Sequence, residues 1–215
     1  ENIRVNVVVN LIRTFVLTLL SFITFPWVCR YLGDSVLGQY TWALTFVSYF
    51  LILAKIGIPN LALRECVKVR DNKELLSNRA QMFFILQLIT TLISFALMCV
   101  LVFSITSLRD SKALIFILSL NFLAGAFSFE WIFIALEKQF YMSVRSIAVL
   151  TISAILIIIF VTTPNDVYIY SFATISVTVA TTIANLFYIR KYISFKKTLP
   201  YDYKSIAKPL LVISM

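Results

Sequence analysis

Residues 113–145 read ALIFILSLNFLAGAFSFEWIFIALEKQFYMSVR, and this stretch decides the fold because a charged turn closes an apolar run that contains one carboxylate, Glu130. The apolar part, 113–136, has about 24 residues, and as an α-helix it spans the roughly 30 Å hydrocarbon core of a bilayer. The stretch therefore predicts a transmembrane helix. Counted back from Glu137, where the polar turn begins, Glu130 lies roughly 10 Å inside the membrane boundary at 1.5 Å per residue.

The interior carboxylate of Glu130 needs an explanation, because an acid at the centre of a membrane helix costs about 3 kcal/mol on insertion scales. Such a residue is tolerated when it faces a partner or a water-filled cavity. Two interpretations stay open. Glu130 belongs to a binding site, or it pairs only to hold helices together or stays protonated.

The composition of the chain indicates a polytopic membrane protein. Of its 215 residues 60% are hydrophobic and 13% are charged, whereas soluble domains have roughly 25% charged residues. The absence of histidine excludes a Ser-His-Asp triad, a histidine metal site and a histidine proton relay. Four glycines form no phosphate-binding loop, and three cysteines have no metal-binding spacing. We expect neither a cofactor nor a metal.

The apolar runs predict an all-α bundle of transmembrane helices, with six complete spans and the start of a seventh. The spans are 5–28, 39–61, 80–106, 113–136, 146–163 and 167–188. Residues 1–205 form one transmembrane lobe, and 206–215 begin the seventh span. The chain starts with Glu1 and stops within an apolar run. We therefore expect it to be a piece of a longer protein.

Polar residues recur every three or four positions along three of these spans, which places them on one helical face. The stripes include Asn10, Arg13, Thr14, Thr18 and Ser21 in the first span, Thr41, Thr45, Ser48 and Lys55 in the second, and Ser171, Thr174, Thr178, Thr181 and Asn185 in the sixth. For a single Ser or Thr, interhelical hydrogen bonding of about 0.6–2 kcal/mol is the favoured explanation. Three aligned stripes instead predict the walls of a polar cleft. The aliphatic fifth span is expected to face lipid or to pack, and to carry no chemistry.

The distribution of basic residues predicts a cytoplasmic N-terminus. Fourteen of the nineteen lysines and arginines then lie in cytoplasmic segments, three lie outside, and Arg13 and Lys55 lie within spans. The fourteen are Arg4, Arg64, Lys68, Arg70, Lys73, Arg79, Lys138, Arg145, Arg190, Lys191, Lys196, Lys197, Lys204 and Lys208. This sorting by leaflet excludes a nucleic-acid partner. It also places Arg13, Lys55 and Glu130 at similar depth in the cytoplasmic half, so they can meet.

Several segments carry a resemblance to a known family. They are PWVCRYLGDSVLGQYTWALTFVSYF (26–50), AKIGIPNLALRE (54–65), FSFEWIFIALEKQFYMSVRSI (127–147), IRKYISF (189–195) and IAKPLL (206–211). In this order the segments resemble the bacterial polysaccharide repeat-unit (O-antigen and capsule) flippases of the multidrug/oligosaccharidyl-lipid/polysaccharide exporter superfamily. The family-motif residues are Arg64, Glu65, Trp131, Glu137 and Arg145, with Glu130 as the acidic residue before the tryptophan.

The resemblance implies a transporter that rocks two helical lobes around a central cavity, with this chain as the N-terminal lobe. It implies transport of an undecaprenyl-pyrophosphate-linked oligosaccharide across the bacterial cytoplasmic membrane, and no enzymatic activity. The implied partners are the lipid-linked oligosaccharide, membrane lipids, the second lobe of the same transporter and polysaccharide polymerase machinery.

The expected substrate-binding residues combine the interior charges with their polar neighbours: Arg13, Lys55, Glu130, Asn10, Thr14 and Asn185. Arginine and lysine suit an anionic pyrophosphate, Glu130 would tune them, and the polar stripes would contact sugar hydroxyls. Three rivals remain. In a cation-coupled exporter of small amphiphiles, Glu130 would be the ion-coupling site. The second rival, a membrane glycosyltransferase or polymerase, needs catalytic groups at a membrane face or in a large outer loop. The third, a non-transporting scaffold, does not need the aligned polar stripes.

Overall fold

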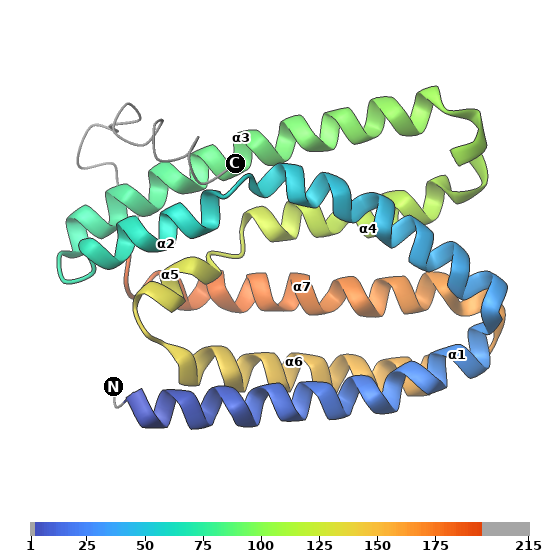
Figure 1. Cartoon of the computed structure of the whole chain (residues 1–215), viewed down its shortest axis with the longest axis horizontal. Helices are drawn as coiled ribbons and strands as arrows, with labels where there is room; N and C mark the ends of the chain where they lie inside the picture. The colour runs from blue at the N-terminus through green and yellow to red at the C-terminus, as the bar shows by residue number, and fades with distance from the viewer. Residues whose placement is uncertain (1–2, 195–215) are drawn as a thin grey trace.

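A computed structural model describes residues 3–194, and every regular element within them is helical. The elements are α1 (Ile3–Lys55), α2 (Ile58–Lys68), α3 (Lys73–Ser104), η1 (Thr106–Ser111), α4 (Lys112–Ala126), α5 (Glu130–Ala135), α6 (Gln139–Phe160), η2 (Pro164–Asp166) and α7 (Val167–Ile189). The long helices lie side by side along the bundle (Figure 1). The predicted all-α class is confirmed.

The second predicted span, 39–61, extends beyond the end of α1 at Lys55 into α2. Helix α1 itself has a kink between the first two predicted spans. Its 53 residues would extend about 80 Å if straight, more than twice the hydrocarbon core. Gly33 interrupts it with φ 72° and ψ 165°, a conformation that is essentially restricted to glycine. The helix therefore folds back as two arms, an N-terminal arm (3–32) and a return arm (34–55) (Figure 1).

Five helical segments in the described chain are long and apolar enough to cross a membrane. They are Val7–Lys68, Lys73–Ser104, Lys112–Ala135, Gln139–Phe160 and Pro164–Ile189. The first has 62 residues, which is long enough for two crossings because about 20 residues suffice for one. The protein is therefore a multi-pass membrane protein. The predicted start of a seventh span lies outside the described residues.

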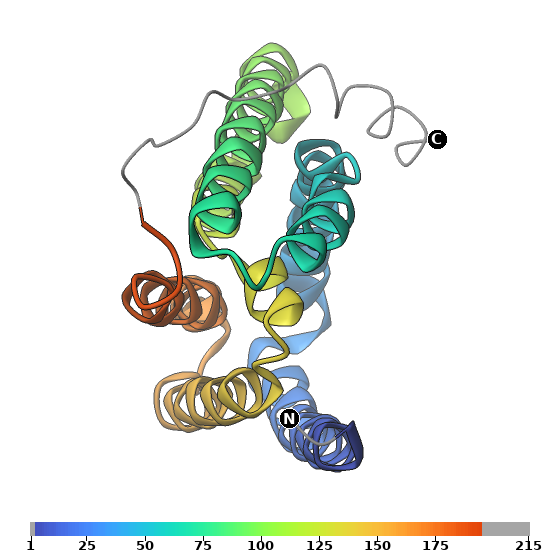
Figure 2. The same ribbon diagram turned by 90° about the vertical axis from the view of Figure 1, so that its left-hand side faces the viewer.

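The helices pack in pairs that polar contacts connect. In the N-terminal arm, Trp27 Nε1 donates to the Val161 carbonyl at the end of α6 (3.1 Å). Ser94 Oγ of α3 donates to the Phe50 carbonyl of the return arm (2.6 Å). Viewed from one end, α6 lies beside the N-terminal arm, and α3 lies near α2 on the other side of the bundle (Figure 2). Interhelical bonding thus explains Ser94 without a ligand.

The predicted fourth span is broken before its acidic residue, so a continuous helix over 113–136 is wrong. Helix α4 ends at Ala126, and Phe129 adopts a left-handed conformation with φ 48°. Glu130 then begins the short helix α5, which is anchored by the buried side chains of Trp131 and Phe133. Exposed backbone groups at such a break are expensive in a membrane unless protein groups satisfy them.

Helix α6 begins at Gln139, well before the predicted span at 146–163. Arg145 therefore lies inside this helix, and its side chain is only 4% exposed. The sixth span is close to its prediction, because 167–188 corresponds to α7, Val167–Ile189.

Candidate functional site

A cavity of about 390 Å³ lies between the two arms of α1 and helices α4, α6 and α7. This volume is within the range of small-molecule sites, roughly 300–1,000 Å³. Its walls comprise Arg13, Leu17, Leu51, Lys55, Asn121, Gly125, Ser128, Glu130, Arg145, Ser146, Leu150, Val177, Thr178, Thr181 and Thr182. We refer to it as the main cavity. The structure thus brings Arg13, Lys55 and Glu130 together.

The two cations reach the main cavity from opposite arms of α1. Arg13 is partly buried on the N-terminal arm, and its Nε has no hydrogen-bond partner among the described residues. Lys55 is the last residue of α1, where the positive charge complements the helix dipole. The chain then turns at Gly57, which has φ 70°, so the lysine lies at an exposed helix end.

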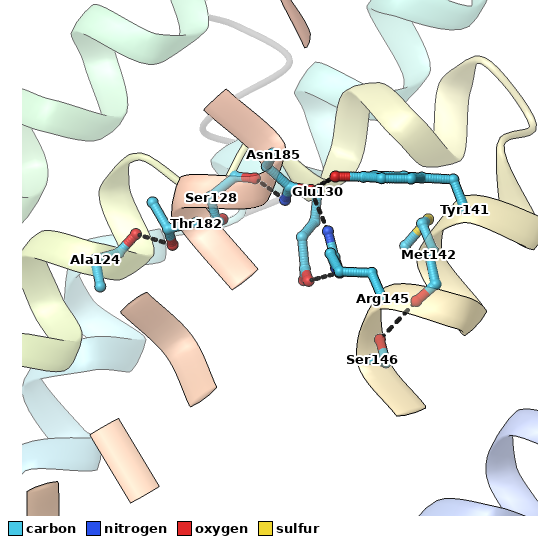
Figure 3. A network of polar contacts seen from close by, with 9 residues as sticks. All are labelled: Ala124, Ser128, Glu130, Tyr141, Met142, Arg145, Ser146, Thr182 and Asn185. Carbon is cyan, nitrogen blue, oxygen red and sulfur yellow. Dashed lines mark hydrogen bonds and ion pairs between the residues drawn. The ribbon is translucent and has the colours of Figure 1, made fainter. Parts of the chain in front are cut away.

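Glu130 pairs with Arg145 inside the bundle. Arg145 Nη2 donates to Glu130 Oε1 at 2.9 Å. The side chains differ in exposure, since Arg145 is 4% exposed and Glu130 is 47% exposed. Figure 3 shows Arg145 between the carboxylate and Asn185. The arginine is therefore a buried support, and the carboxylate is the more accessible member of the pair.

The side-chain amide of Asn185 supports this ion pair from α7, and Asn185 is fully buried. Its Oδ1 accepts hydrogen bonds from Arg145 Nη1 and from the Tyr141 hydroxyl, the latter at 3.3 Å. Its Nδ2 donates to the Ser128 carbonyl at the break between α4 and α5. These bonds fix the orientation of the amide. Asn185 is not among the residues that line the main cavity, and its predicted contact with the substrate stays a prediction.

Asn10 and Thr14, the other two predicted contacts, are exposed and do not line the main cavity. Thr14 Oγ1 donates to the Asn10 carbonyl one turn earlier (2.9 Å), and Thr18 repeats the bond to Thr14 (2.9 Å). Thr41 and Thr45 of the return arm do the same within their helix. Bonds within α1 thus satisfy these hydroxyls. The substrate-binding role of Asn10 and Thr14 stays a prediction.

The stripe on α7 does reach the main cavity, through Thr178, Thr181 and Thr182. Helix α6 also reaches it, through Arg145, Ser146 and Leu150, although the corresponding span was expected to carry no chemistry. The predicted span began at 146, which left Arg145 in a turn, whereas the structure places Arg145 inside α6. An interior carboxylate requires a nearby cation or cavity, so the search for a partner of Glu130 could have found this arginine.

The main cavity has an excess of positive charge. Its walls contain three cations, Arg13, Lys55 and Arg145, and one carboxylate, Glu130, which leaves a formal charge of +2. Arginine offers forked donors and lysine offers a compact charge, and both are suited to phosphate oxygens. Within the described residues, no group of three Cys, Asp or Glu side chains could hold a metal ion. The arrangement is suited to hold a dianion.

A comparison with protein-family models decides the family of this chain. A model described as polysaccharide biosynthesis protein matches residues 3–212. The chain belongs to the polysaccharide biosynthesis protein family. A search of curated proteins and a search of solved structures found no match. Family membership confirms the predicted resemblance and supports a role in polysaccharide export.

The family-motif residues of this polysaccharide biosynthesis protein have different surroundings. Trp131 is buried in the core, and Glu65 pairs with Lys68 at 2.6 Å and with Arg64 at 3.7 Å. Glu137 pairs with Arg70 at 2.6 Å and joins the turn after α5 to the turn after α2. The hydrogen bond from the Arg70 guanidinium and its charge lower the pKa of Glu137. Arg145 lines the main cavity, as does Glu130, the acidic residue before the tryptophan.

Proposed function

We propose that this polysaccharide biosynthesis protein flips a lipid-linked oligosaccharide repeat unit, carried on undecaprenyl pyrophosphate, across the membrane by alternating access. The product would serve export of O-antigen, capsule or a related polysaccharide. The observation that carries the proposal is the main cavity, which lies between membrane-spanning helices and has a formal charge of +2. A diphosphate diester has two ionised phosphate groups, so the charges match.

The free-energy cost of placing charged side chains inside the membrane supports a transport role. A guanidinium at the centre of a membrane helix costs about 3 kcal/mol on insertion scales, and Arg13 has no ion-pair partner within the described chain. A purely structural role would be fulfilled by a neutral amide at lower cost. A headgroup phosphate would supply the acceptors that Arg13 lacks, while Lys55 would neutralise the second phosphate.

The proposal also covers the membrane, the orientation and the partners of the transporter. We infer a bacterial cytoplasmic membrane with a cytoplasmic N-terminus, because the basic residues accumulate in the segments that this orientation places inside. Alternating access requires a second lobe that closes the cavity from the other side. Polysaccharide polymerase machinery would receive the flipped repeat unit.

The test replaces Arg13 in the transporter and measures complementation of glycan export, together with membrane abundance. We expect Arg13→Ala to abolish export at normal abundance. Arg13→Lys should retain part of the activity because it keeps the charge but loses the fork. Arg30→Ala is the matched control, since Arg30 is exposed and does not line the main cavity. Normal export by an abundant Arg13→Ala protein would remove Arg13 from the site.

The main alternative is a cation-coupled exporter of small amphiphiles, in which Glu130 binds the coupling ion. Its half-exposed carboxylate is the observation that favours this function. The ion pair with Arg145 argues against it, because a cation would have to compete with a buried guanidinium. Substrate-dependent cation flux that Glu130→Gln abolishes would favour the exporter. Glycosyl transfer by the purified protein would instead favour a membrane glycosyltransferase or polymerase. Export that continues in cells without this protein would favour the remaining alternative, a non-transporting scaffold.

A further inference from the structure

A second cavity of about 160 Å³ adjoins the main cavity near the break between α4 and α5. The two share Lys55, Gly125, Ser128 and Glu130 as wall residues. We refer to the smaller one as the side chamber. At roughly 30 Å³ per water molecule, its volume corresponds to about five waters, which suits one pyranose ring. A ligand in the main cavity can therefore extend into the side chamber.

The side chamber differs from the main cavity in charge. Of the charged residues, it contains Lys55 and Glu130, whose formal charges cancel. Arg13 and Arg145, which make the main cavity positive, do not line it. Electrostatics thus favours an anion in the main cavity and a neutral ligand in the side chamber.

The remaining walls of the side chamber combine amides with apolar side chains. Asn60 of α2, Gln87 of α3 and Ser128 supply polar groups, while Trp131 and Ile134 of α5 supply apolar surface. Amide and hydroxyl groups both donate and accept hydrogen bonds. This combination suits a sugar ring, which has hydroxyl groups at its edge and C–H groups on its faces.

Gln87 shows that hydrogen-bonding capacity remains at this wall. Its Nε2 donates to the Ala54 carbonyl (3.0 Å) and contacts Thr91 Oγ1 (3.3 Å), which fixes the orientation of the amide. Its Oε1 is left without a hydrogen-bond partner, although Gln87 is only 7% exposed. Buried acceptors normally have partners. A sugar hydroxyl that reached this oxygen would provide one.

We propose that the side chamber binds the first sugar of the lipid-linked oligosaccharide while the main cavity holds its diphosphate. This inference rests on the proposed function and adds a sugar subsite to it. The diphosphate and the first sugar are covalently adjacent, as the two cavities are adjacent at Ser128 and Glu130. Specificity for that sugar would then come from Asn60 and Gln87, because they line the side chamber and not the main cavity.

The experiment measures binding of two probes to the purified protein in nanodiscs. One probe is a polyprenyl diphosphate that carries one hexose, and the other carries a methyl group in place of the hexose, so the charge is equal. We expect the wild type to bind the hexose probe about tenfold more tightly, which corresponds to roughly one well-formed hydrogen bond.

Two variants locate the sugar. Asn60→Ala removes a polar group from an exposed position of α2, and Ile134→Trp fills the side chamber from α5. Both should reduce the hexose preference to less than about threefold and leave the affinity for the methyl probe unchanged. The matched control is Asn165→Ala, because Asn165 is exposed in η2 and lines neither cavity.

The outcomes separate this inference from the proposed function. If the wild type binds both probes equally, the sugar subsite is wrong and the diphosphate site stands. If it prefers the hexose probe but neither variant changes the preference, the sugar lies elsewhere and the inference is overturned. If neither probe binds, the proposed function fails and the subsite fails with it.

Discussion

The position of Arg145 should depend on Asn185, and Asn185→Ala tests this dependence. The substitution removes three hydrogen bonds, two accepted by Oδ1 from Arg145 and Tyr141 and one donated by Nδ2 to Ser128. Measured interhelical hydrogen bonds in membranes average about 0.6 kcal/mol, so three amount to about 2 kcal/mol. The charge of the buried Arg145 should place the loss at or above this value.

A double-mutant cycle isolates the contribution of the contact with Arg145. Arg145→Met removes the guanidinium and keeps an extended side chain at this buried position. If Asn185 acts through Arg145, Asn185→Ala should destabilise the Arg145→Met protein by about 1–2 kcal/mol less than the wild type. Reversible unfolding of the purified protein in mixed micelles measures each free energy, and binding of a polyprenyl diphosphate probe measures the effect on the main cavity.

The control for this cycle is Ser153→Ala. Ser153 Oγ donates to the Ala173 carbonyl at 2.9 Å, so the substitution removes one α6–α7 hydrogen bond that shares no partner with Arg145. Ser153→Ala should lower the free energy of unfolding by about 0.6 kcal/mol. Its effect and that of Arg145→Met should be additive within about 0.5 kcal/mol. If Asn185→Ala were equally additive with Arg145→Met, Asn185 would only hold α7 in place, and our account of the ion pair would be refuted.

Three further predictions concern topology, pH and the α1 break. In intact cells, an impermeant thiol reagent should label Asn165→Cys but not Lys68→Cys, both at exposed positions; the opposite pattern would reverse the orientation. The Glu137 carboxyl has a pKa below its usual 4.5, so its stabilising pairing is complete above about pH 4.5 and is lost as pH falls through the lowered pKa. The thermal midpoint of Glu137→Gln should therefore fall less than that of the wild type on acidification; equal falls would contradict the pairing. Gly33→Ala should destabilise the protein by about 1–3 kcal/mol because φ is 72° there. The control Gly38→Ala, within regular helix, should be neutral or stabilising by up to about 1 kcal/mol. Equal effects of the two substitutions on the unfolding free energy would argue against strain at the break.

The sequence was sufficient to predict the fold class and three of the four charged residues that line the main cavity. The length of an apolar run is a strong signal, because the thickness of the bilayer sets it. The depth of Arg13, Lys55 and Glu130 predicted that they could meet, and all three line the main cavity. Depth is predictable because helical rise is constant at 1.5 Å per residue.

The details around these charges were not predictable from hydropathy. The chain turns back between the first two spans at a single residue, Gly33, whose positive φ interrupts α1. The break at Phe129 has no proline or glycine at that position, and it forms where buried α5 side chains and the Asn185 amide stabilise it. Such tertiary contacts have no signal in a hydropathy profile. The misplaced start of α6 had the largest consequence, because it left Arg145 outside the predicted helix.

The charges of the main cavity divide into a fixed pair and two free cations. Asn185 accepts a hydrogen bond from Arg145, and Arg145 pairs with Glu130, so this pair contributes no net charge. Arg13 and Lys55 lie on opposite arms of α1 without an ion-pair partner within the described chain, and they contribute the whole formal charge of +2. An anion that bridged them would link the N-terminal arm to the return arm across the cavity. A change in the relative position of the two arms would therefore change the affinity for the anion, which is the coupling between binding and conformation that alternating access requires.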